Sequence, residues 1–361
     1  MTVPLETWQI GPWNRWAYQH VGEVVPTVPV ARGTGPVWEL PARPADLGPE
    51  VDALLETGFV DGLAVLHDGA LVVERYGNGM EPDTLHLSQS VGKSVLGLLV
   101  GALAGDGLLD PDSPVAEHVP EIAGSGFDRA TVRHLLDMTT AIDFVEDYLD
   151  FVRYDAACGW HPPVPGAPRS ILEFLPTIGP VAWGHGERFH YATPNTDLLG
   201  IVAERAGGAP LAELISRALW APMGAERDAE LTVDPAATAA IGGGFCATLR
   251  DYTRLGALLL EDGRGVVPAE WIAGLGAGDD AAFAARTVPD TGPGITGYAG
   301  QWWRRDERTA ARGIHGQLVA VDRAAAAVVT ILSSWPAALD VALDAAQRAV
   351  VDAVCGRLAA R

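Results

Sequence analysis

The sequence predicts an α+β fold in which both ends of the chain build one antiparallel sheet and helices flank it. Apolar residues alternate as in strands over residues 62–76, follow helical spacing through much of 108–290, and alternate again over 297–333. We therefore expect residues 1–107 to form an N-terminal arm and the first part of an α/β domain. Residues 108–290 would form an inserted, mostly helical domain, and residues 291–361 the second part of the α/β domain.

The N-terminal elements follow from local residue types. Residues 1–50 are rich in proline, glycine and tryptophan, which predicts an irregular arm anchored by buried indole rings. Asp68-Gly69 is a typical hairpin turn pair and separates two strand-like runs, 62–67 and 71–76. Ser88 has the residue type of a helix N-cap, so we expect a helix from there to about residue 104, with Ser90 in its first turn.

The remaining elements follow from hydrophobic periodicity. Helices are expected at 132–138, 196–206, 211–219 and 250–260. Strands are expected at 297–303, 313–315, 318–321 and 326–333, followed by a final helix over about 337–358. The sequence contains no internal repeat, so a repeat architecture is not expected.

Composition narrows the classes of partner. The formal net charge of −21 would repel nucleic-acid phosphates and anionic lipid surfaces, so neither nucleic acid nor membrane is expected to bind. The longest apolar run, near residues 95–104, is too short to cross a bilayer. The first residues lack the pattern of a secretory signal, which favours a cytoplasmic location. The remaining candidate partner is a small molecule.

Cysteine and histidine spacing gives no sign of a disulfide framework or of a metal site. Cys158, Cys246 and Cys355 are far apart and without CxxC spacing, so we expect reduced, packed thiols. His185 and His190 have no third ligand at suggestive spacing. We therefore expect neither a metal nor a cofactor.

Lys93 is the only lysine among the 25 basic residues of the chain. Arginine cannot lose its proton in a protein, whereas lysine can, so a single retained lysine indicates a catalytic base. It follows Ser90 by three positions, which places the two side chains on one face of a helix. A neutral amine there could take the serine proton as the hydroxyl attacks a carbonyl carbon.

The start of the helix favours the same chemistry. Burial near its positive end disfavours the ammonium form of Lys93, and the Ser90 backbone N–H can face a developing oxyanion.

Two other motifs that contain a serine or lysine do not match this segment. A P-loop needs glycine where Leu87 stands, and a nucleophile elbow needs glycines two residues before and after its serine, whereas Ser88 precedes Ser90.

Further stretches accompany this pair in a characteristic order: 109–121, 132–140 and 242–251. With them the chain resembles the serine β-lactamase and penicillin-binding-protein superfamily, in its class C and esterase-like branch, over about residues 50–335. It resembles more closely the 6-aminohexanoate-dimer hydrolases, the nylon-oligomer hydrolases, from near Trp8 almost to the end of the chain. This likeness rests on residues 13–17, 143–148, 159–160, 195–197, 301–303, 313–317 and 333–336. The resemblance implies a β-lactamase-like fold.

The resemblance also implies the other parts of a catalytic site. Tyr191 stands in the second catalytic block and would share proton transfer with Lys93, and the sequence does not decide which of them is the first base. Arg312-Gly313-Ile314 occupies the third block, where the Ile314 N–H would complete the oxyanion hole. His315 comes next, and strand alternation turns it away from Ile314, which favours a structural role over substrate contact.

Several residues are implied for substrate binding. Tyr148 matches a tyrosine that closes over the substrate, and Asp155 an acidic residue that holds the amino end of a linear amide. Trp160 and Trp183 are candidates for the wall of an apolar acyl pocket, with core packing as the alternative. Thr193 replaces the usual asparagine and the third block lacks lysine, so penicillin hydrolysis should be weak, although Arg312 could partly substitute.

The expected function is that of a serine hydrolase that forms an acyl-enzyme. Short-acyl carboxylic esters are the first expected substrates, followed by linear amides such as 6-aminohexanoate oligomers. Two alternatives stay open: a β-lactamase or D-Ala peptidase, and a catalytically silent binding protein on the same fold. The sequence is silent on oligomeric state, and a homodimer is compatible with it.

Overall fold

Two antiparallel sheets organise the chain in this computed structural model, which describes residues 3–147, 151–287 and 292–360. The larger sheet has the strand order β3-β2-β11-β10-β9-β8-β7, and the smaller one β1-β5-β6-β4. The strands are β1 (Thr27–Val30), β2 (Val60–His67), β3 (Ala70–Tyr76), β4 (His86–Leu87), β5 (Ala229–Thr232), β6 (Phe245–Ala247), β7 (Ile295–Ala299), β8 (Trp302–Arg305), β9 (Arg308–Gly313), β10 (Gln317–Asp322) and β11 (Ala327–Ser333).

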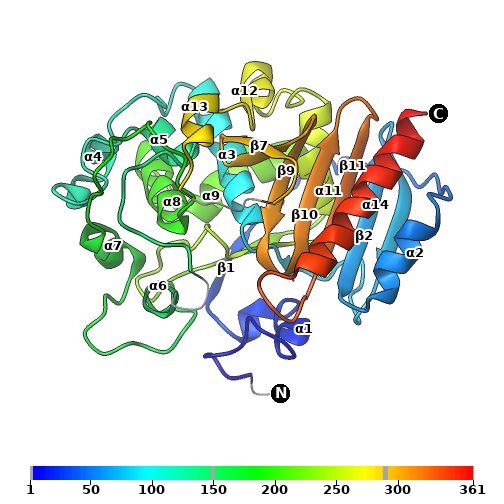
Figure 1. The fold of residues 1–361 in the computed structure, drawn as a ribbon, viewed down its shortest axis with the longest axis horizontal. Coiled ribbons are helices and arrows are strands. Elements are labelled where there is room, and N and C mark those ends of the chain that lie inside the picture. The colour runs from blue at the N-terminus through cyan, green and yellow to red at the C-terminus, as the bar shows by residue number, and fades with distance from the viewer. Residues whose placement is uncertain (1–2, 148–150, 288–291, 361) are drawn as a thin grey trace.

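Helices surround these sheets and fill most of the middle of the chain (Figure 1). The α-helices are α1 (Asn14–Ala17), α2 (Pro49–Glu56), α3 (Val91–Gly105), α4 (Val115–His118), α5 (Val132–Leu136), α6 (Val152–Ala157), α7 (Ile171–Phe174), α8 (Thr193–Gly207), α9 (Leu211–Ile215), α10 (Ala221–Met223), α11 (Leu249–Leu260), α12 (Ala269–Gly274), α13 (Asp280–Ala284) and α14 (Val341–Ala359). Shorter turns are η1 (Val21–Glu23), η2 (Pro120–Ile122), η3 (Leu175–Thr177), η4 (Ser216–Trp220) and η5 (Ile314–Gly316).

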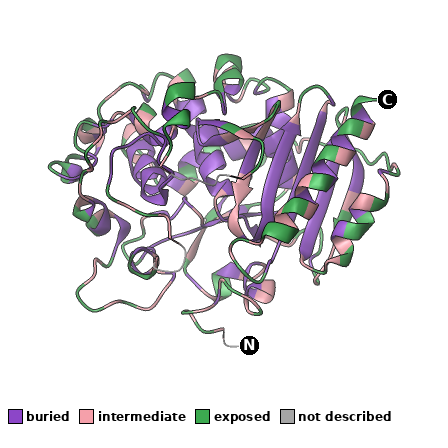
Figure 2. Ribbon diagram, in the orientation of Figure 1, coloured by how far each residue is buried: buried purple, intermediate pink, exposed green. Residues whose placement is uncertain are grey.

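The larger sheet is buried on both faces, which separates two parts of the hydrophobic core. Along β2, Leu63 and Val65 pack beneath α2 and α14, whereas Ala64 and Leu66 point to the opposite face, toward α3 and α11. Figure 1 shows α14 crossing the sheet, and Figure 2 shows its buried stripe facing the strands. The result is a layered arrangement in which α3 lies against the sheet.

The predicted hairpin and the joining of the chain ends are confirmed. Strand β2 pairs with β3 on one side and with the C-terminal β11 on the other. Asp68 and Gly69 have φ angles of 46° and 72°, the left-handed values that a tight two-residue hairpin turn requires. Because β2 and β11 are far apart in sequence, this pairing fixes the N-terminal part of the chain against its C-terminal part.

The smaller sheet was not predicted. It joins the N-terminal arm to the helical region, because β1 of the arm pairs with β5 and β4 pairs with β6. These strands are two to four residues long, so they carry too little alternation to be recognised from sequence. Their pairing holds the segment before Ser90 against the segment around residue 245.

Prediction of the start of the Ser90 helix was wrong in detail. The N-cap of α3 is Ser90 itself, and its side chain makes no capping hydrogen bond. The Ser88 hydroxyl instead donates to the Phe245 carbonyl oxygen at 2.9 Å, because strand pairing with β6 extends past Leu87. Ser90 therefore stands at the N-terminal end of α3, and its hydroxyl is not used for capping.

Three C-terminal predictions also need correction. Residues 297–303 form parts of two strands, β7 and β8, because Gly300 and Gln301 turn the chain with positive φ angles. The strand expected at 313–315 ends at Gly313 and gives way to η5. The final helix begins at Val341 rather than at 337, because the Asp340 side chain caps the N–H groups of residues 342 and 343.

Candidate active site

Ser90 and Lys93 meet at the N-terminal end of α3, as their spacing predicts. The Lys93 Nζ lies 2.8 Å from the Ser90 Oγ and donates to the Gly242 carbonyl oxygen at 2.5 Å. Gly92 permits this approach, because a Cβ at that position would lie 2.6 Å from the Ile241 carbonyl oxygen. The 241–242 backbone therefore reaches the helix closely enough to hold the amine.

Burial controls the charge of Lys93, whose side chain is almost inaccessible. It lowers the pKa of the amine to about 8, although the carboxylates of Glu146 and Asp197 act in the opposite direction. A lysine with a pKa near 8 is neutral in roughly a tenth of the molecules at pH 7, compared with well under a thousandth for an ordinary lysine. The amine can therefore act as a base at neutral pH.

Asp197, on α8, supports the backbone that holds Lys93. Its carboxylate accepts the Gly242 N–H at 2.7 Å and the hydroxyl of Tyr154. Burial raises the pKa of Asp197 to about 6, against these two hydrogen bonds and the nearby lysine. The segment 195–197 contributes to the family resemblance, but the sequence indicates no role for Asp197, because its contact with residue 242 is not local.

Tyr191 lies beside the pair, in the extended segment that leads into α8. Its ring centroid is 5.3 Å from the Lys93 Nζ, and the ring stacks on Trp303 with a centroid distance of 5.3 Å. Burial raises the pKa of Tyr191 well above its usual value of 10, and a hydrogen bond with Ser90 offsets only part of this. The phenol is therefore protonated at neutral pH, which suits a proton relay better than a resting base.

Ile314 and Ser90 line the same cavity, about 310 Å³ in volume. Their segments touch through Gly313, where a Cβ would lie 2.5 Å from the Ser88 carbonyl oxygen and 3.1 Å from the Gln89 Cβ. Glycine is therefore needed at position 313 to let β9 approach the start of α3. This contact brings together the two segments whose N–H groups the sequence assigned to an oxyanion hole.

The Ser90 cavity, as we call it, also contains several of the residues predicted to bind substrate. Asp155 on α6, Trp160 and His315 line it, and the N-terminal arm adds residues 5–10. Burial raises the pKa of Asp155 to about 7, although Gln9 donates to its carboxylate at 3.4 Å. The cavity wall thus combines indole surface with carboxyl groups.

Trp160 and Trp183 differ in their surroundings. Trp160 packs edge-on against Trp8 of the arm, with ring centroids 5.4 Å apart, and its Nε1 donates to Thr232. Trp183 is not among the described residues that line the cavity; it packs near His190 and under the Arg188 guanidinium instead. Tyr148 lies outside the described residues.

His315 is held by the protein rather than exposed as a base. Its Nδ1 lies 2.7 Å from the Trp335 carbonyl oxygen, and burial lowers the pKa of its ring to about 4. The expectation that strand alternation orients it was wrong, because its φ of 60° belongs to the turn η5. Arg312, the candidate substitute for the missing lysine, pairs with Asp344 of α14 at 3.1 Å.

Glu146 is a residue of the Ser90 cavity that sequence reasoning missed. Its carboxylate accepts both the Thr193 N–H at 2.9 Å and the Thr193 hydroxyl at 2.5 Å. Thr193, which stands where the family pattern has asparagine, therefore anchors an acidic group in the cavity. No sequence signal separated this glutamate from the other acidic residues of its segment.

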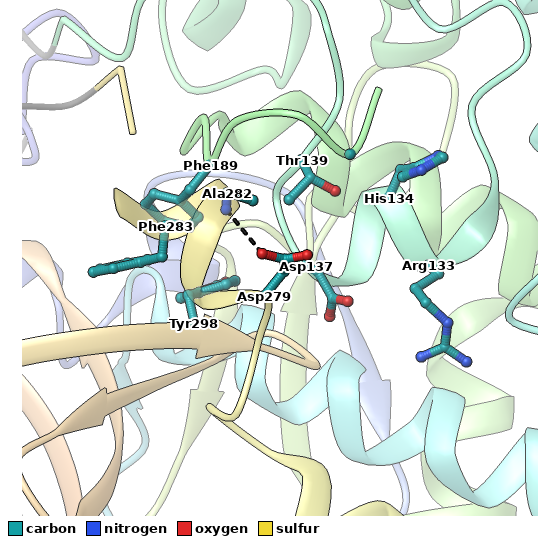
Figure 3. A pocket seen from close by; sticks show the side chains of 10 residues that line it. Arg133, His134, Asp137, Thr139, Phe189, Asp279, Ala282, Phe283 and Tyr298 are labelled. Atoms are coloured by element: carbon teal, nitrogen blue, oxygen red, sulfur yellow. Dashed lines mark hydrogen bonds between the residues drawn. The ribbon is translucent and has the colours of Figure 1, made fainter. Parts of the chain in front are cut away.

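A second cavity, of about 190 Å³, borders the aromatic cluster around Tyr191, and Figure 3 shows the residues that line it. Phe189 and Tyr298 belong both to its wall and to that cluster. Of its two acidic residues, Asp137 and Asp279, Asp137 accepts the Gly300 N–H at 2.9 Å, and burial raises the pKa of the Asp137 carboxyl to about 6. This second cavity is lined by neither Ser90 nor Lys93, whereas Ser90 lines the Ser90 cavity.

Within residues 3–147, 151–287 and 292–360, no group of three or more histidine, cysteine, aspartate or glutamate residues is arranged to hold a metal ion. The three cysteines are free and buried. In the same part of the chain, no helix is both long and apolar enough to cross a membrane.

Comparisons with known proteins show which family the chain belongs to. The Beta-lactamase family model matches residues 52–353. The 6-aminohexanoate-dimer hydrolase of Paenarthrobacter ureafaciens is 37% identical over 350 residues, which cover 92% of this chain and 88% of that protein.

Solved structures show the same fold. A Bacillus anthracis protein provisionally named a 6-aminohexanoate-dimer hydrolase has a TM-score of 0.88 at 22% identity, covering 99% of this chain and 97% of its own. A family VIII carboxylesterase has a TM-score of 0.63 at 16% identity, covering 89% of this chain and 100% of its own. With a family model matched across most of its length and a hydrolase 37% identical to it, the chain belongs to the Beta-lactamase family as a serine hydrolase.

Proposed function

We propose that the Ser90 cavity cleaves short-acyl carboxylic esters, and linear amides with a free amino end such as 6-aminohexanoate oligomers, through an acyl-enzyme on Ser90. The observation that carries this proposal is the buried Lys93 amine, 2.8 Å from the Ser90 hydroxyl with a pKa lowered to about 8. A serine with a neutral amine in hydrogen-bond contact is an activated nucleophile.

The first half of the reaction uses Lys93 as base. The neutral amine takes the Ser90 proton while the Oγ bonds to the substrate carbonyl carbon, and the carbonyl oxygen becomes an oxyanion. The N–H groups of Ser90 and Ile314 donate to that oxyanion. Collapse of the intermediate expels the alcohol or amine, which receives the proton from Lys93 through the Tyr191 hydroxyl.

Water completes the cycle by the same route. It attacks the acyl carbon and gives its proton to the Tyr191–Lys93 pair, and a second oxyanion forms between the same N–H groups. Collapse then breaks the bond to the Ser90 Oγ, which recovers its proton, and the carboxylic acid leaves. Because the high pKa of Tyr191 keeps its phenol protonated, we assign the resting base to Lys93 and the relay to Tyr191.

The cavity wall supports a preference for substrates with a cationic end. Asp155 and Glu146 both line it, and the chain as a whole has a net charge of −21. A carboxylate in a partly dehydrated cavity attracts an ammonium group more strongly than one in water. The relative from Paenarthrobacter ureafaciens is named for a substrate of this type, an amide with a free amino end. Tyr148 and Trp160 are proposed as further substrate contacts.

Efficient β-lactam hydrolysis or D-Ala peptidase activity is not proposed. Thr193 is bonded to Glu146 and Arg312 to Asp344, so neither side chain is placed to do the work of the family's asparagine and lysine. The silent binding protein is also disfavoured, because Ser90, Lys93 and Tyr191 are all present and close together. The homodimer and the cytoplasmic location stay predictions, which light scattering and cell fractionation can test.

The test is the initial rate of p-nitrophenyl acetate and butyrate hydrolysis by the wild type and by Ser90→Ala, with the linear 6-aminohexanoate dimer and a chromogenic cephalosporin in parallel. Ser94→Ala is the matched control, because it removes a buried hydroxyl from the same helix that donates to the Gln301 carbonyl oxygen. We expect Ser90→Ala alone to lose ester turnover by at least about a thousandfold. A folded wild type that hydrolyses none of the four substrates would contradict the proposal.

A further inference from the structure

The two segments that flank the proposed oxyanion hole contain left-handed residues with side chains. Gln89, directly before Ser90, has a φ of 50°, and His315, directly after Ile314, has a φ of 60°. Residues with a Cβ are disfavoured in this region, so they persist only where the surroundings hold them. Because Gln89 shares a peptide bond with the Ser90 N–H, its torsions set the direction of that donor.

The N-terminal arm holds Gln89. The Gln89 Nε2 donates to the Tyr18 hydroxyl oxygen at 2.9 Å and to the Gln9 Oε1 at 3.3 Å. The Tyr18 backbone carbonyl oxygen accepts the Leu87 N–H at 2.8 Å. The Tyr18 side-chain hydroxyl donates to the Gln9 carbonyl oxygen at 3.1 Å. Tyr18 is fully buried, so its contacts position the chain just before the nucleophile.

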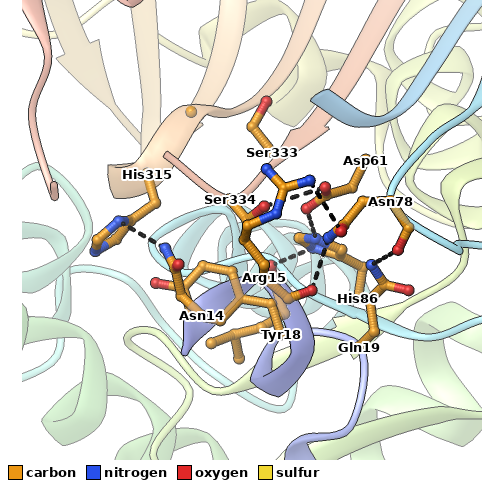
Figure 4. Close-up of polar contacts among 12 residues, drawn as sticks. Asn14, Arg15, Tyr18, Gln19, Asp61, Asn78, His86, His315, Ser333 and Ser334 are labelled. Atoms are coloured by element: carbon orange, nitrogen blue, oxygen red, sulfur yellow. Dashed lines mark hydrogen bonds and ion pairs between the residues drawn. The ribbon is translucent and has the colours of Figure 1, made fainter. Parts of the chain in front are cut away.

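The same part of the arm holds His315 (Figure 4). The Tyr18 ring packs edge-on against the His315 ring, with centroids 5.6 Å apart. The Asn14 Nδ2 donates to the Trp335 carbonyl oxygen at 2.7 Å and lies 3.4 Å from the His315 Nδ1. The backbone N–H of His315 itself bonds to the Ala338 carbonyl oxygen at 2.9 Å.

The arm is anchored independently of these contacts. Arg15 donates to the Gly58 carbonyl oxygen at 2.6 Å and to the Asn78 side chain at 3.0 Å, and Asn78 donates back to the Arg15 carbonyl oxygen at 2.7 Å. Figure 4 shows Arg15 and Asn78 on the other side of Tyr18 from His315. Tyr18 is thus fixed between a firm anchor and the two left-handed residues.

We propose that Tyr18 is a positioning residue, which sets the geometry of the oxyanion hole by holding Gln89 through its hydroxyl and His315 through its ring. This inference rests on the proposed function, because it assumes that the Ser90 and Ile314 N–H groups receive the oxyanion. Tyr18 does not contact the substrate in this proposal; it acts on the transition state through the Ser90 and Ile314 N–H groups. Its loss should slow the chemical step more than it weakens substrate binding.

The experiment compares Tyr18→Phe with the wild type in the pre-steady-state hydrolysis of p-nitrophenyl butyrate. The burst amplitude counts functional sites, and the burst rate gives the acylation rate constant per site. Tyr18→Phe removes the nearer of the two acceptors of the Gln89 Nε2, leaves the Gln9 Oε1 as the other, and keeps the ring against His315. We expect an unchanged amplitude, an acylation rate constant about tenfold lower, and an unchanged pH midpoint, because misdirected donors cost rate without altering Lys93.

Tyr76→Phe is the matched control, because it removes a phenol hydroxyl that donates to Glu74 and touches neither Gln89 nor His315. It should acylate at the wild-type rate. A merely structural role for Tyr18 would lower the burst amplitude and leave the rate per site intact. An acylation rate constant within twofold of the wild type in Tyr18→Phe overturns the proposal.

Gln89→Ala tests the same hydrogen bond from its other end if Tyr18→Phe does not fold. Its acylation rate constant should fall by a similar factor, and the double variant should be no slower than the slower single one. A wild-type rate constant in Gln89→Ala overturns the proposal. If the wild type shows neither a burst nor turnover, the proposed function itself fails; if it shows both and the variants match it, only the role of Tyr18 fails.

Discussion

Replacing Lys93 by methionine should abolish turnover and, at neutral pH, remove a source of instability. The amine is buried, and its pKa is lowered from 10.5 to about 8 in the folded protein. The folded state therefore resists protonation more than the unfolded state does. Each pKa unit corresponds to about 1.4 kcal/mol, so holding the ammonium form in the site costs roughly 3 kcal/mol at pH 7.

The direction in which stability changes with pH follows from proton linkage. Below pH 8 both states carry a protonated Lys93, and the full penalty applies. Between about pH 8 and 10.5 the folded state has released this proton while the unfolded state retains it, so stability rises with pH. With these two pKa values, the contribution of Lys93 to the free energy of unfolding should increase by about 2 kcal/mol between pH 7 and pH 9.5.

The assay is urea unfolding of the wild type and Lys93→Met at pH 7 and at pH 9.5. Other titrating groups are common to both proteins, so the change with pH in the difference between them isolates Lys93. Part of the gain in Lys93→Met at pH 7 is lost, because the Gly242 carbonyl oxygen loses its donor. A stability difference that stays constant with pH within about 0.5 kcal/mol would refute the reasoning.

Four further predictions test other parts of the site and fold. Asp155→Asn should lower kcat/KM for the 6-aminohexanoate dimer at least about tenfold and change p-nitrophenyl acetate hydrolysis less than twofold, whereas equal losses would contradict an ammonium contact. Relative to the ester, wild-type activity on the dimer should rise with pH through about 7, because burial raises the pKa of Asp155 to about 7 and only the carboxylate attracts the cation. Asp61→Ala should lower the free energy of unfolding by about 3 kcal/mol in a urea titration. The substitution removes the buried carboxylate that lies 3.0 Å from the His86 Nε2 and leaves that nitrogen without its partner. A loss below about 1 kcal/mol would count against this. Gly92→Ala should reduce kcat about tenfold with little change in KM, because its Cβ would displace the Ile241 carbonyl, and an unchanged kcat would show that the helix can yield there.

Local spacing was enough to predict the centre of the site. Lys93 follows Ser90 by three positions, and one helical turn brings their side chains together whatever the rest of the fold does. The hairpin at Asp68-Gly69 is equally local, since the turn requires residues that tolerate positive φ. Alternation and helical periodicity located most of the larger sheet and its covering helices for the same reason.

Features that depend on long-range contacts were missed. The smaller sheet joins β1 to β5 across about 200 residues of chain, and strands so short show no periodicity of their own. Glu146 and Asp197 enter the site through hydrogen bonds to residues 193 and 242, which no spacing rule predicts. His315 was predicted to lie in a strand, whereas it has a positive φ. No sequence pattern indicates which non-glycine residue will have such an angle.

Several departures from ordinary protein structure lie around Ser90. Lys93 is a buried cation at neutral pH, Asp155 and Asp197 are carboxyl groups whose pKa burial raises, and Gln89 and His315 have disfavoured backbone angles. Each would destabilise a protein in isolation, and each needs support from elements distant in sequence. The arm, the 242 loop and α8 supply that support, which explains why both ends of the chain reach the site. Stabilising substitutions at these positions should therefore be easy to find and costly to activity, whereas similar substitutions on the outer face of α14 should be neutral.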